Sequence, residues 1–321
     1  VVTGDLGPLD ERVAHRPQPW RAYVEIMRGC SNYCAYCVVP YARGPEVSRT
    51  DDDILGEIGA LADSGCREVI LLGQNVNSYG KDRGDSDAFP ALLARVQDIA
   101  GIRWIRFLTS NPQDISDSLI EAMSSCGKVC RQIHFPLQSG SDRILRAMNR
   151  RYTRDEYLAR VDALRGAMPG IAFSSDFIVG FPGETREDFL ATRSAMERVT
   201  FASAFIFKYS VRAGTAAASR DDNVPKAEKE ARHKELLDMQ NAHTHDHHRA
   251  QVGTLQEVLV DGPSKRDDAM LQGRTGRYYN VVFPGPARLA GEFVPVRMTE
   301  CTALTLYGRQ ESDGSNERGT S

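Results

Sequence analysis

The sequence predicts an α/β protein, with a parallel sheet in a large first domain and a small antiparallel β-barrel after it. Between residues 20 and 210, six short apolar runs rich in β-branched residues alternate with helical segments. Strand-then-helix units in series favour a parallel sheet, either doubly wound or closed as a partial barrel. Beyond residue 248 the apolar runs become shorter and alternating, and glycine and proline interrupt them, which is typical of a small barrel.

Each expected strand of the parallel sheet is followed by a helix, and several helices have start signals. Thr50, Thr153 and Thr185 are each followed three residues later by an acidic residue, a pattern that caps the first helical turn. Reactive groups in such sheets gather at the carboxyl ends of the strands, so we expect the site there. The expected strands are 22–27, 68–73, 103–109, 132–138, 172–180 and 203–210.

The second half of the chain changes character after a long charged segment. Residues 225–248 predict a helix that begins after Pro225, and four alternating runs follow at 254–260, 276–283, 292–300 and 302–308. A chain of 321 residues suits one large and one small domain. We expect a remnant or linker of a preceding domain at 1–15, the large domain at 16–248, the barrel at 249–310 and a disordered tail at 311–321.

Composition narrows the class of protein. Apolar residues make up 41% and charged residues 26% of the chain, as in ordinary globular proteins. No apolar run reaches the length of a membrane span, so we expect a cytoplasmic protein that binds no membrane. A net charge of −3 gives no global sign of nucleic-acid binding, which would need a local basic face. The seven cysteines are clustered, which favours metal ligation over disulfides.

Three of these cysteines, Cys30, Cys34 and Cys37, lie within eight residues just after the first expected strand. A structural zinc site commonly takes four protein ligands in two separated pairs. Three thiolates instead suit a cubane 4Fe-4S cluster and leave one iron open to bind a substrate. A zinc site with a distant fourth ligand and three incidental buried cysteines are the alternatives.

The spacing Cys-x3-Cys-x2-Cys, with Tyr36 before the last cysteine, resembles the signature of the radical S-adenosylmethionine (SAM) enzymes. Within that superfamily the chain resembles the MiaB-type tRNA methylthiotransferases more closely. The segments that carry this resemblance, in the order the family has them, are 28–49, 71–80, 137–145, 174–185 and 273–283.

The resemblance implies a partial (β/α)6 barrel of the radical SAM type, followed by a TRAM RNA-binding barrel. It also implies a 4Fe-4S cluster with one open iron, held by Cys30, Cys34 and Cys37, which cleaves SAM to methionine and a 5′-deoxyadenosyl radical. The implied reaction is methylthiolation of carbon 2 of N6-isopentenyladenosine at position 37 of tRNA, beside the anticodon, with two SAM molecules per turnover. The implied partners are tRNA and a reducing electron-donor protein, and we expect a monomer.

Strand ends would hold SAM if the resemblance applies. Without it, the glycine-rich turn at 180–183 and the polar turn at 74–75 read as ordinary loops. Tyr209, Ser210 and Arg212 follow the sixth strand, where they either line the substrate entrance or form a plain loop. The residues implied to bind SAM are Tyr36, Gln74, Asn75, Gln138, Ser139, Asp176, Ile178 and Gly180.

In the small barrel, cationic residues flank two tyrosines, a combination that suits single-stranded RNA. Residues 249–309 hold eight Lys and Arg against six Asp and Glu, so composition alone favours an ordinary solvated barrel. The resemblance reverses that preference and implies RNA contacts from Lys265, Arg266, Arg274, Arg277, Tyr278 and Tyr279. The histidines of 243–248 read as a solvated helix end, with a metal site as the alternative.

The family also carries a domain before the radical SAM core, with three cysteines that hold a second 4Fe-4S cluster. No cysteine precedes Cys30 in this sequence, so we expect that domain to be missing here. Whether sulfur insertion proceeds without it stays open. Two other interpretations also stay open: methylthiolation of threonylcarbamoyladenosine in tRNA or of a ribosomal protein aspartate, and a non-catalytic RNA-binding protein that contains a cluster.

Overall fold

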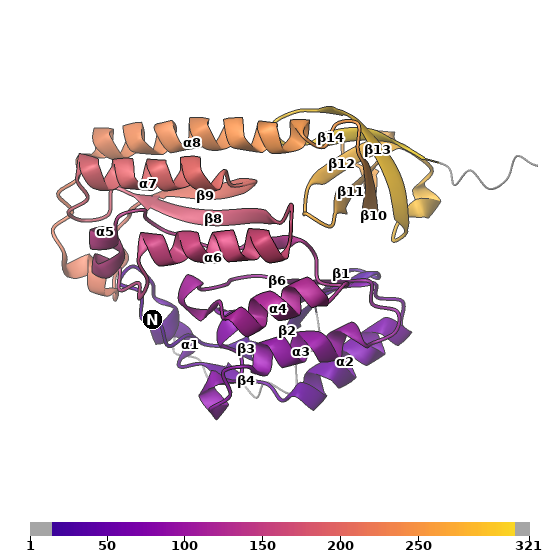
Figure 1. The fold of residues 1–321 in the computed structure, drawn as a ribbon, viewed down its shortest axis with the longest axis horizontal. Coiled ribbons are helices and arrows are strands. Elements are labelled where there is room, and N and C mark those ends of the chain that lie inside the picture. Colours follow the sequence, from indigo (N-terminus) through magenta and orange to yellow (C-terminus); the bar gives the residue numbers. More distant parts are fainter. Residues whose placement is uncertain (1–14, 312–321) are drawn as a thin grey trace, which may run out of the picture. The chain divides into compact units, whose positions relative to one another are not determined.

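The computed structural model describes residues 15–311 (Figure 1). It divides into two compact units, and the division falls between Gln240 and Asn241, inside the long helix α8 (Lys226–Arg249). The predicted linker (1–15) and the predicted tail (311–321) lie outside the described residues except for His15 and Glu311. None of the helices within residues 15–311 has both the length and the apolar character needed to cross a membrane.

All six predicted parallel strands are present in the first unit. Strands β2, β5 and β6 pair in parallel, as do β7, β8 and β9, and a parallel bridge from Ile105 to Val129 joins the two groups. The spatial order follows the chain order without the reversal of a doubly wound sheet, so the sheet is a partial (β/α)6 barrel. The strands are β2 (Arg21–Glu25), β5 (Glu68–Leu72), β6 (Trp104–Phe107), β7 (Gln132–His134), β8 (Ala172–Val179) and β9 (Ser203–Lys208).

Three short strands in this unit were not predicted. β1 (His15–Gln18) pairs antiparallel with β2, and β3 (Met27–Arg28) pairs antiparallel with β4 (Val47–Ser48). β1 has no buried residue and β3 and β4 have two residues each, so none of them carries a readable apolar alternation.

Helices follow the parallel strands as predicted, and the three threonine caps are confirmed. Thr50 accepts a hydrogen bond from the Asp53 N–H, while Thr153 and Thr185 each form a reciprocal capping box. The helices of the first unit before α8 are α1 (Val39–Arg43), α2 (Asp51–Asp63), α3 (Ala88–Gln97), α4 (Asp117–Ser125), α5 (Asp142–Ala147), α6 (Arg154–Ala167) and α7 (Arg186–Val199). Short 3-10 turns lie at η2 (Val76–Ser78), η3 (Lys81–Arg83), η4 (Pro112–Asp114) and η5 (Ala216–Ser219).

Alternation along the strands separates the core from an accessible face. On β8, Phe173, Phe177 and Val179 are buried in the main hydrophobic core. Asp176 and Ile178, which alternate with them, are only half-buried because successive side chains of a strand point to opposite faces. This half-buried face is the one on which the candidate site lies.

Asp188 fixes the loop after β7 to the start of α7. Its carboxylate accepts hydrogen bonds from Ser141 Oγ at 2.6 Å and from the Thr185 N–H at 2.8 Å, and it forms an ion pair with Arg143. Burial alone would raise the pKa of Asp188, but these bonds outweigh it and lower the pKa to about 2.

We expect Asp188→Asn to lower the free energy of unfolding by about 1–2 kcal/mol near neutral pH. A carboxyl group whose pKa is lower in the folded state than in the unfolded state stabilises the protein fully at pH values above its unfolded-state pKa. The wild-type advantage should therefore be complete above about pH 5 and decline between about pH 4 and pH 2. Urea unfolding of both proteins across this range measures it, and a pH-independent difference would contradict the assignment.

The second unit is a small closed barrel with strand order β10-β11-β12-β14-β13. The sequence did not predict β11, whose first three residues are exposed and give no apolar alternation. Four of the five strand pairings in the described barrel are antiparallel, as expected, and only β12 and β14 pair in parallel. Glu311 follows β14 and forms an ion pair with Arg297 at 2.6 Å. The elements are β10 (Leu255–Ser264), β11 (Asp267–Thr275), β12 (Asn280–Pro284), η6 (Ala287–Leu289), β13 (Phe293–Cys301) and β14 (Leu306–Gln310).

Candidate active site

The three clustered cysteines lie in a loop between β3 and α1, near the carboxyl end of the first parallel strand. All three are free, half-buried thiols. The loop begins at Gly29, whose φ is +77° and where a Cβ atom would stand 1.9 Å from the Pro45 carbonyl oxygen. Only glycine fits this position, so the sequence that introduces the cysteines also fixes how the loop leaves the strand.

Contacts from distant parts of the first unit hold this loop. The Gly29 N–H donates to Gln74 Oε1 at 2.6 Å, and the Ala35 N–H donates to the Met148 carbonyl at 2.9 Å. Asn149 Nδ2 donates to the Tyr33 carbonyl at 2.9 Å. The loop is thereby fixed by residues that follow β5 and α5.

Each cysteine sulfur receives one N–H donor. Asn32 Nδ2 lies 3.4 Å from Cys30 Sγ, Arg150 Nη1 lies 3.3 Å from Cys34 Sγ, and the Val39 N–H donates to Cys37 Sγ at 3.5 Å. Such donors favour sulfur that carries negative charge.

The pKa of the Cys30 and Cys37 thiols indicates which chemistry they suit. Burial raises the pKa of the Cys30 and Cys37 thiols, which makes them poor nucleophiles at neutral pH. A bound metal deprotonates a thiol outright, so ligation is the better use of these groups.

A single metal ion and a cluster make different demands on the three thiols. Among residues 15–311, no three Cys, His, Asp or Glu side chains stand close enough together to hold one metal ion. A mononuclear zinc site would need sulfurs within about 4.6 Å, twice a Zn–S bond. In a cubane each of three thiolates binds a different iron, and three free, half-buried thiols in one loop, each with an N–H donor near its sulfur, fit that ligand set.

A cavity of about 250 Å³ lies beside the cysteine loop. It brings together one cysteine, four of the residues implied to bind SAM and all three of those expected at the substrate entrance. The cysteine is Cys37, the implied SAM residues are Tyr36, Gln138, Asp176 and Ile178, and the residues expected at the substrate entrance are Tyr209, Ser210 and Arg212.

Gln138 shows most clearly why this cavity suits a bound cofactor. The residue lies in the left-handed region with φ of 69°, and its backbone exchanges hydrogen bonds with Asp176 and Ile178 of β8 at 2.8 and 3.0 Å. Its side-chain Oε1 is buried and has no hydrogen-bond partner within the described part of the chain. A buried acceptor without a partner is costly unless a ligand supplies the donor.

The structure does not bring the other four implied SAM residues to this cavity. Asn75 is buried and bonds Asp114 and the Asn111 N–H, and Ser139 is buried against Thr192. Both side chains have hydrogen-bond partners inside the fold, and their contact with SAM stays a prediction.

Gln74 and Gly180 also have other contacts. Gln74 supports the cysteine loop through Gly29. The Gly180 N–H donates to the Glu184 carboxylate, and a Cβ on Gly180 would meet the Lys229 side chain at 2.3 Å. Glycine is required there for packing and for its φ of +69°.

Sequence reasoning missed Arg150, the donor to Cys34. Its Nε donates to Tyr152 Oη at 2.9 Å and its Nη2 to the Pro136 carbonyl at 3.3 Å, and the side chain is buried. Burial lowers the pKa of Arg150, but Tyr152, Tyr36 and Cys34 raise it well above its ordinary value, so the residue stays charged. No local pattern marks this arginine, because it meets Cys34 only through the tertiary fold.

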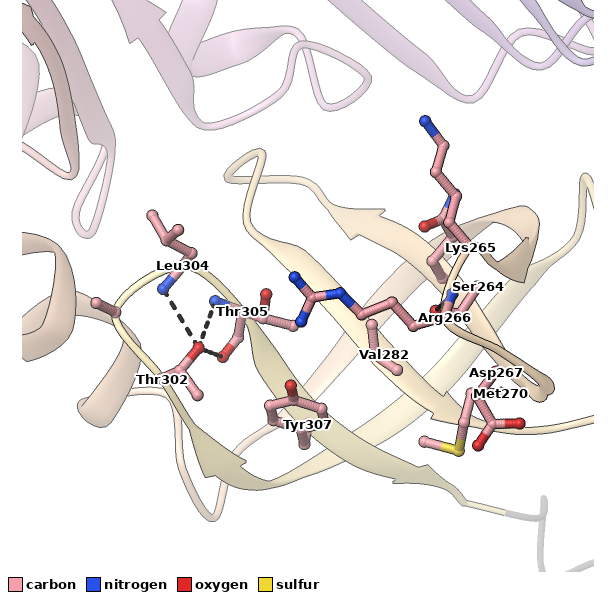
Figure 2. Close-up of a pocket in the computed structure, with 12 residues that line it drawn as sticks. Ser264, Lys265, Arg266, Asp267, Met270, Val282, Thr302, Leu304, Thr305 and Tyr307 are labelled. Atoms are coloured by element: carbon pink, nitrogen blue, oxygen red, sulfur yellow. Dashed lines mark hydrogen bonds between the residues drawn. The ribbon is translucent and has the colours of Figure 1, made fainter.

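The basic residues of the barrel form two separate groups. Lys265 and Arg266 lie in the turn between β10 and β11 and line a groove of about 730 Å³ together with Thr305 and Tyr307. Figure 2 shows Arg266 reaching across this groove towards Thr305, whereas Lys265 points away from it.

The second basic group lies near the other end of β11. The Arg274 guanidinium stands 4.4 Å from the centre of the Tyr278 ring, and Arg277 donates to Gln251 Oε1 at 3.2 Å. The six implied RNA residues therefore do not form one continuous patch.

Tyr279 and His248 pack on each other at the end of α8. Tyr279 is 7% exposed and packs edge-on against His248 at 5.2 Å, so its ring is not available to stack on a base. His248 is buried, and its Nδ1 lies 3.0 Å from the Thr302 carbonyl. This end of α8 therefore packs against the barrel instead of being wholly solvated.

Comparison with known proteins agrees with this geometry. The radical SAM superfamily model matches residues 24–196, and the TRAM domain model matches residues 249–310. Coproporphyrinogen III oxidase from Escherichia coli, a radical SAM enzyme, superposes with a TM-score of 0.51 at 13% identity, covering 79% of this chain and 66% of that one. A radical SAM methyltransferase from Kitasatospora setae also superposes with a TM-score of 0.51, at 16% identity, covering 61% of this chain and 38% of that one.

Curated relatives are much closer in sequence. Proteins named tRNA-2-methylthio-N(6)-dimethylallyladenosine synthase are 48% identical in Syntrophomonas wolfei subsp. wolfei and 47% in Thermoanaerobacter sp., over 89% and 96% of this chain. The chain spans 64% and 65% of the length of these two relatives. The relative of that name from Carboxydothermus hydrogenoformans is 46% identical over 94% of this chain and 69% of its own length. The chain therefore belongs to the radical SAM superfamily and, within it, to the family of the MiaB-type tRNA methylthiotransferases.

Proposed function

We propose that this chain provides the radical SAM core and the RNA-binding barrel for methylthiolation of carbon 2 of N6-isopentenyladenosine at position 37 of tRNA. The proposal rests on one observation: Cys37, four implied SAM residues and the residues after β9 line the same cavity. The names of the relatives support the substrate. Because this chain spans 64% and 65% of their length, we propose the complete reaction from their names and from the site together.

Cys30, Cys34 and Cys37 hold the cluster in this proposal, and their N–H donors stabilise the charge on the sulfurs. When bound, the cluster supplies the electron that cleaves SAM to methionine and a 5′-deoxyadenosyl radical. Gln138 Oε1 accepts a hydrogen bond from SAM, and the half-buried Asp176 carboxylate accepts another. Ile178 gives the cavity an apolar wall beside them.

The substrate side of the proposal rests on the residues after β9 and on the barrel. Arg212 lines the cavity and offers a cation to a nucleotide phosphate. The adenine must leave its stack to reach the cavity, which a flexible anticodon loop allows at low cost. Lys265 and Arg266 bind the tRNA backbone from the barrel, and we place the reaction in the cytoplasm with a separate protein as electron donor.

Anaerobic reconstitution tests this function. The chain is loaded with iron and sulfide, then given a strong reductant, SAM and isopentenylated tRNA, and 5′-deoxyadenosine and digested nucleosides are measured by mass spectrometry. We expect 5′-deoxyadenosine from the wild type and a loss of at least about 100-fold in Cys34→Ala, because three thiolates are needed to hold the cluster. No 5′-deoxyadenosine from a fully loaded wild type would exclude radical chemistry and favour the non-catalytic RNA-binding alternative.

A further inference from the structure

Two exposed phenylalanines on β9 are not used by the site as described so far. Phe205 and Phe207 are 63% and 51% exposed, although large aromatic side chains are normally covered. Their rings stack on each other, with centroids 6.4 Å apart and planes inclined by 19°. Together they form an exposed aromatic surface on the last strand of the partial barrel.

The strand register places this surface beside the cavity. In the parallel pairing of β8 with β9, Phe205 stands opposite Asp176 and Phe207 opposite Ile178. Paired residues of neighbouring strands point to the same face of a sheet. Phe205 and Phe207 therefore share the accessible face with the two cavity residues, while Ile206 between them is buried in the core.

Phe207 also lines the cavity itself, so the aromatic surface is continuous with it. A substrate group that enters this cavity beside Cys37 can therefore contact the Phe207 ring. Lys208 and Arg212 line the same cavity and supply positive charge near the aromatic surface. Exposed aromatic rings with adjacent cations match one unstacked nucleotide, whose base can stack and whose phosphate is negative.

We propose that Phe205 and Phe207 form the binding surface for the isopentenylated adenine and distinguish it from unmodified adenine. This inference rests on the proposed function and names the residues that would select its substrate. The purine lies on the aromatic rings, and the branched five-carbon chain covers apolar surface that water otherwise contacts. An unmodified adenine keeps the stacking but loses the apolar contact of the side chain.

The competing occupant is a polypeptide segment, since β9 is an edge strand within the described sheet. Continuity with the cavity favours the nucleotide, because a segment that covered Phe207 would also cover the cavity wall that the substrate must approach. The two occupants predict different effects of mutation. If a nucleotide binds this surface, mutation changes the selectivity between two RNAs, whereas if a polypeptide segment covers it, that selectivity stays unchanged.

Binding of two anticodon stem-loops tests the inference. One carries N6-isopentenyladenosine and the other adenosine at the same position, and fluorescence anisotropy measures their dissociation constants with the reconstituted chain and SAM, without reductant. We expect the wild type to bind the isopentenylated loop at least about tenfold more tightly, as apolar groups in a complementary site typically allow. Phe205→Ala and Phe207→Ala should each reduce this ratio, and the double variant should bring it to within about twofold.

Two further variants sharpen the result. Phe207→Leu keeps an apolar side chain without a ring, so it should retain part of the preference while weakening binding of both loops. Leu190→Ala removes a 41% exposed leucine from α7, outside the cavity, and should leave the ratio unchanged. Both phenylalanines are more than half exposed, so the variants should fold, which circular dichroism checks.

The outcomes separate this inference from the proposed function. An unchanged ratio in the double variant, no preference in the wild type, or an equal loss of binding to both loops would each overturn the role of the phenylalanines. If the wild type makes 5′-deoxyadenosine in any of these cases, the proposed function stands and only the selectivity surface is wrong. If no 5′-deoxyadenosine forms, the proposed function fails whatever the binding ratio.

Discussion

Glu68→Gln is expected to lower the free energy of unfolding by about 3–5 kcal/mol. Glu68 begins β5 and is fully buried between two arginines from the neighbouring strands. Arg106 Nε lies 2.7 Å from its carboxylate, and Arg21 bonds the other oxygen. Burial alone would raise the pKa of Glu68, but the two guanidinium groups lower it below its ordinary value. Glutamine keeps the shape and removes the charge, which leaves two buried cations without their shared anion.

Urea unfolding followed by circular dichroism measures this loss. Glu230→Gln is the matched control, because Glu230 forms an exposed ion pair with Lys226 at 3.9 Å and should cost less than about 0.5 kcal/mol. A loss below about 1 kcal/mol in Glu68→Gln would mean that solvent or local rearrangement compensates the two arginines.

Arg150→Gln is expected to reduce cluster retention or the rate of 5′-deoxyadenosine formation by about 10- to 100-fold. The arginine is the N–H donor to Cys34 and also connects that cysteine to Tyr152 and Pro136. Glutamine removes the positive charge and cannot make the three contacts together. Arg150→Lys restores the positive charge without the planar guanidinium geometry, so it should reverse only part of the loss.

Iron and sulfide content per chain, visible absorption and the electron paramagnetic resonance signal of the reduced cluster report on Arg150 independently of turnover. Arg151→Gln provides the control, because Arg151 is the exposed neighbour in the sequence and should behave as the wild type. Normal cluster content and an unchanged resonance signal in Arg150→Gln would show that the contact with Cys34 does not affect the cluster.

Local sequence patterns predicted the elements that carry the site. The six parallel strands, the threonine caps and the position of Cys30, Cys34 and Cys37 after the first strand all follow from apolar periodicity, capping chemistry and spacing. The same reasoning missed β11, which lacks a clear alternation, and the short strands β1, β3 and β4. Patterns of this kind report on residues that are neighbours in the chain.

Contacts between distant residues were decided by the tertiary structure. Arg150 meets Cys34 across 116 positions, and Phe205 joins the cavity because the register of β8 and β9 sets it opposite Asp176. The resemblance implies the same role for Asn75 and Gln138, yet packing gives the Asn75 side chain hydrogen-bond partners and leaves Gln138 Oε1 without any among the described residues. The sequence by itself determined the fold class and the grouping of the three cysteines in one loop, because periodicity and spacing are local properties. Which polar side chains face the cavity was decided by strand order and register, which depend on the whole first unit.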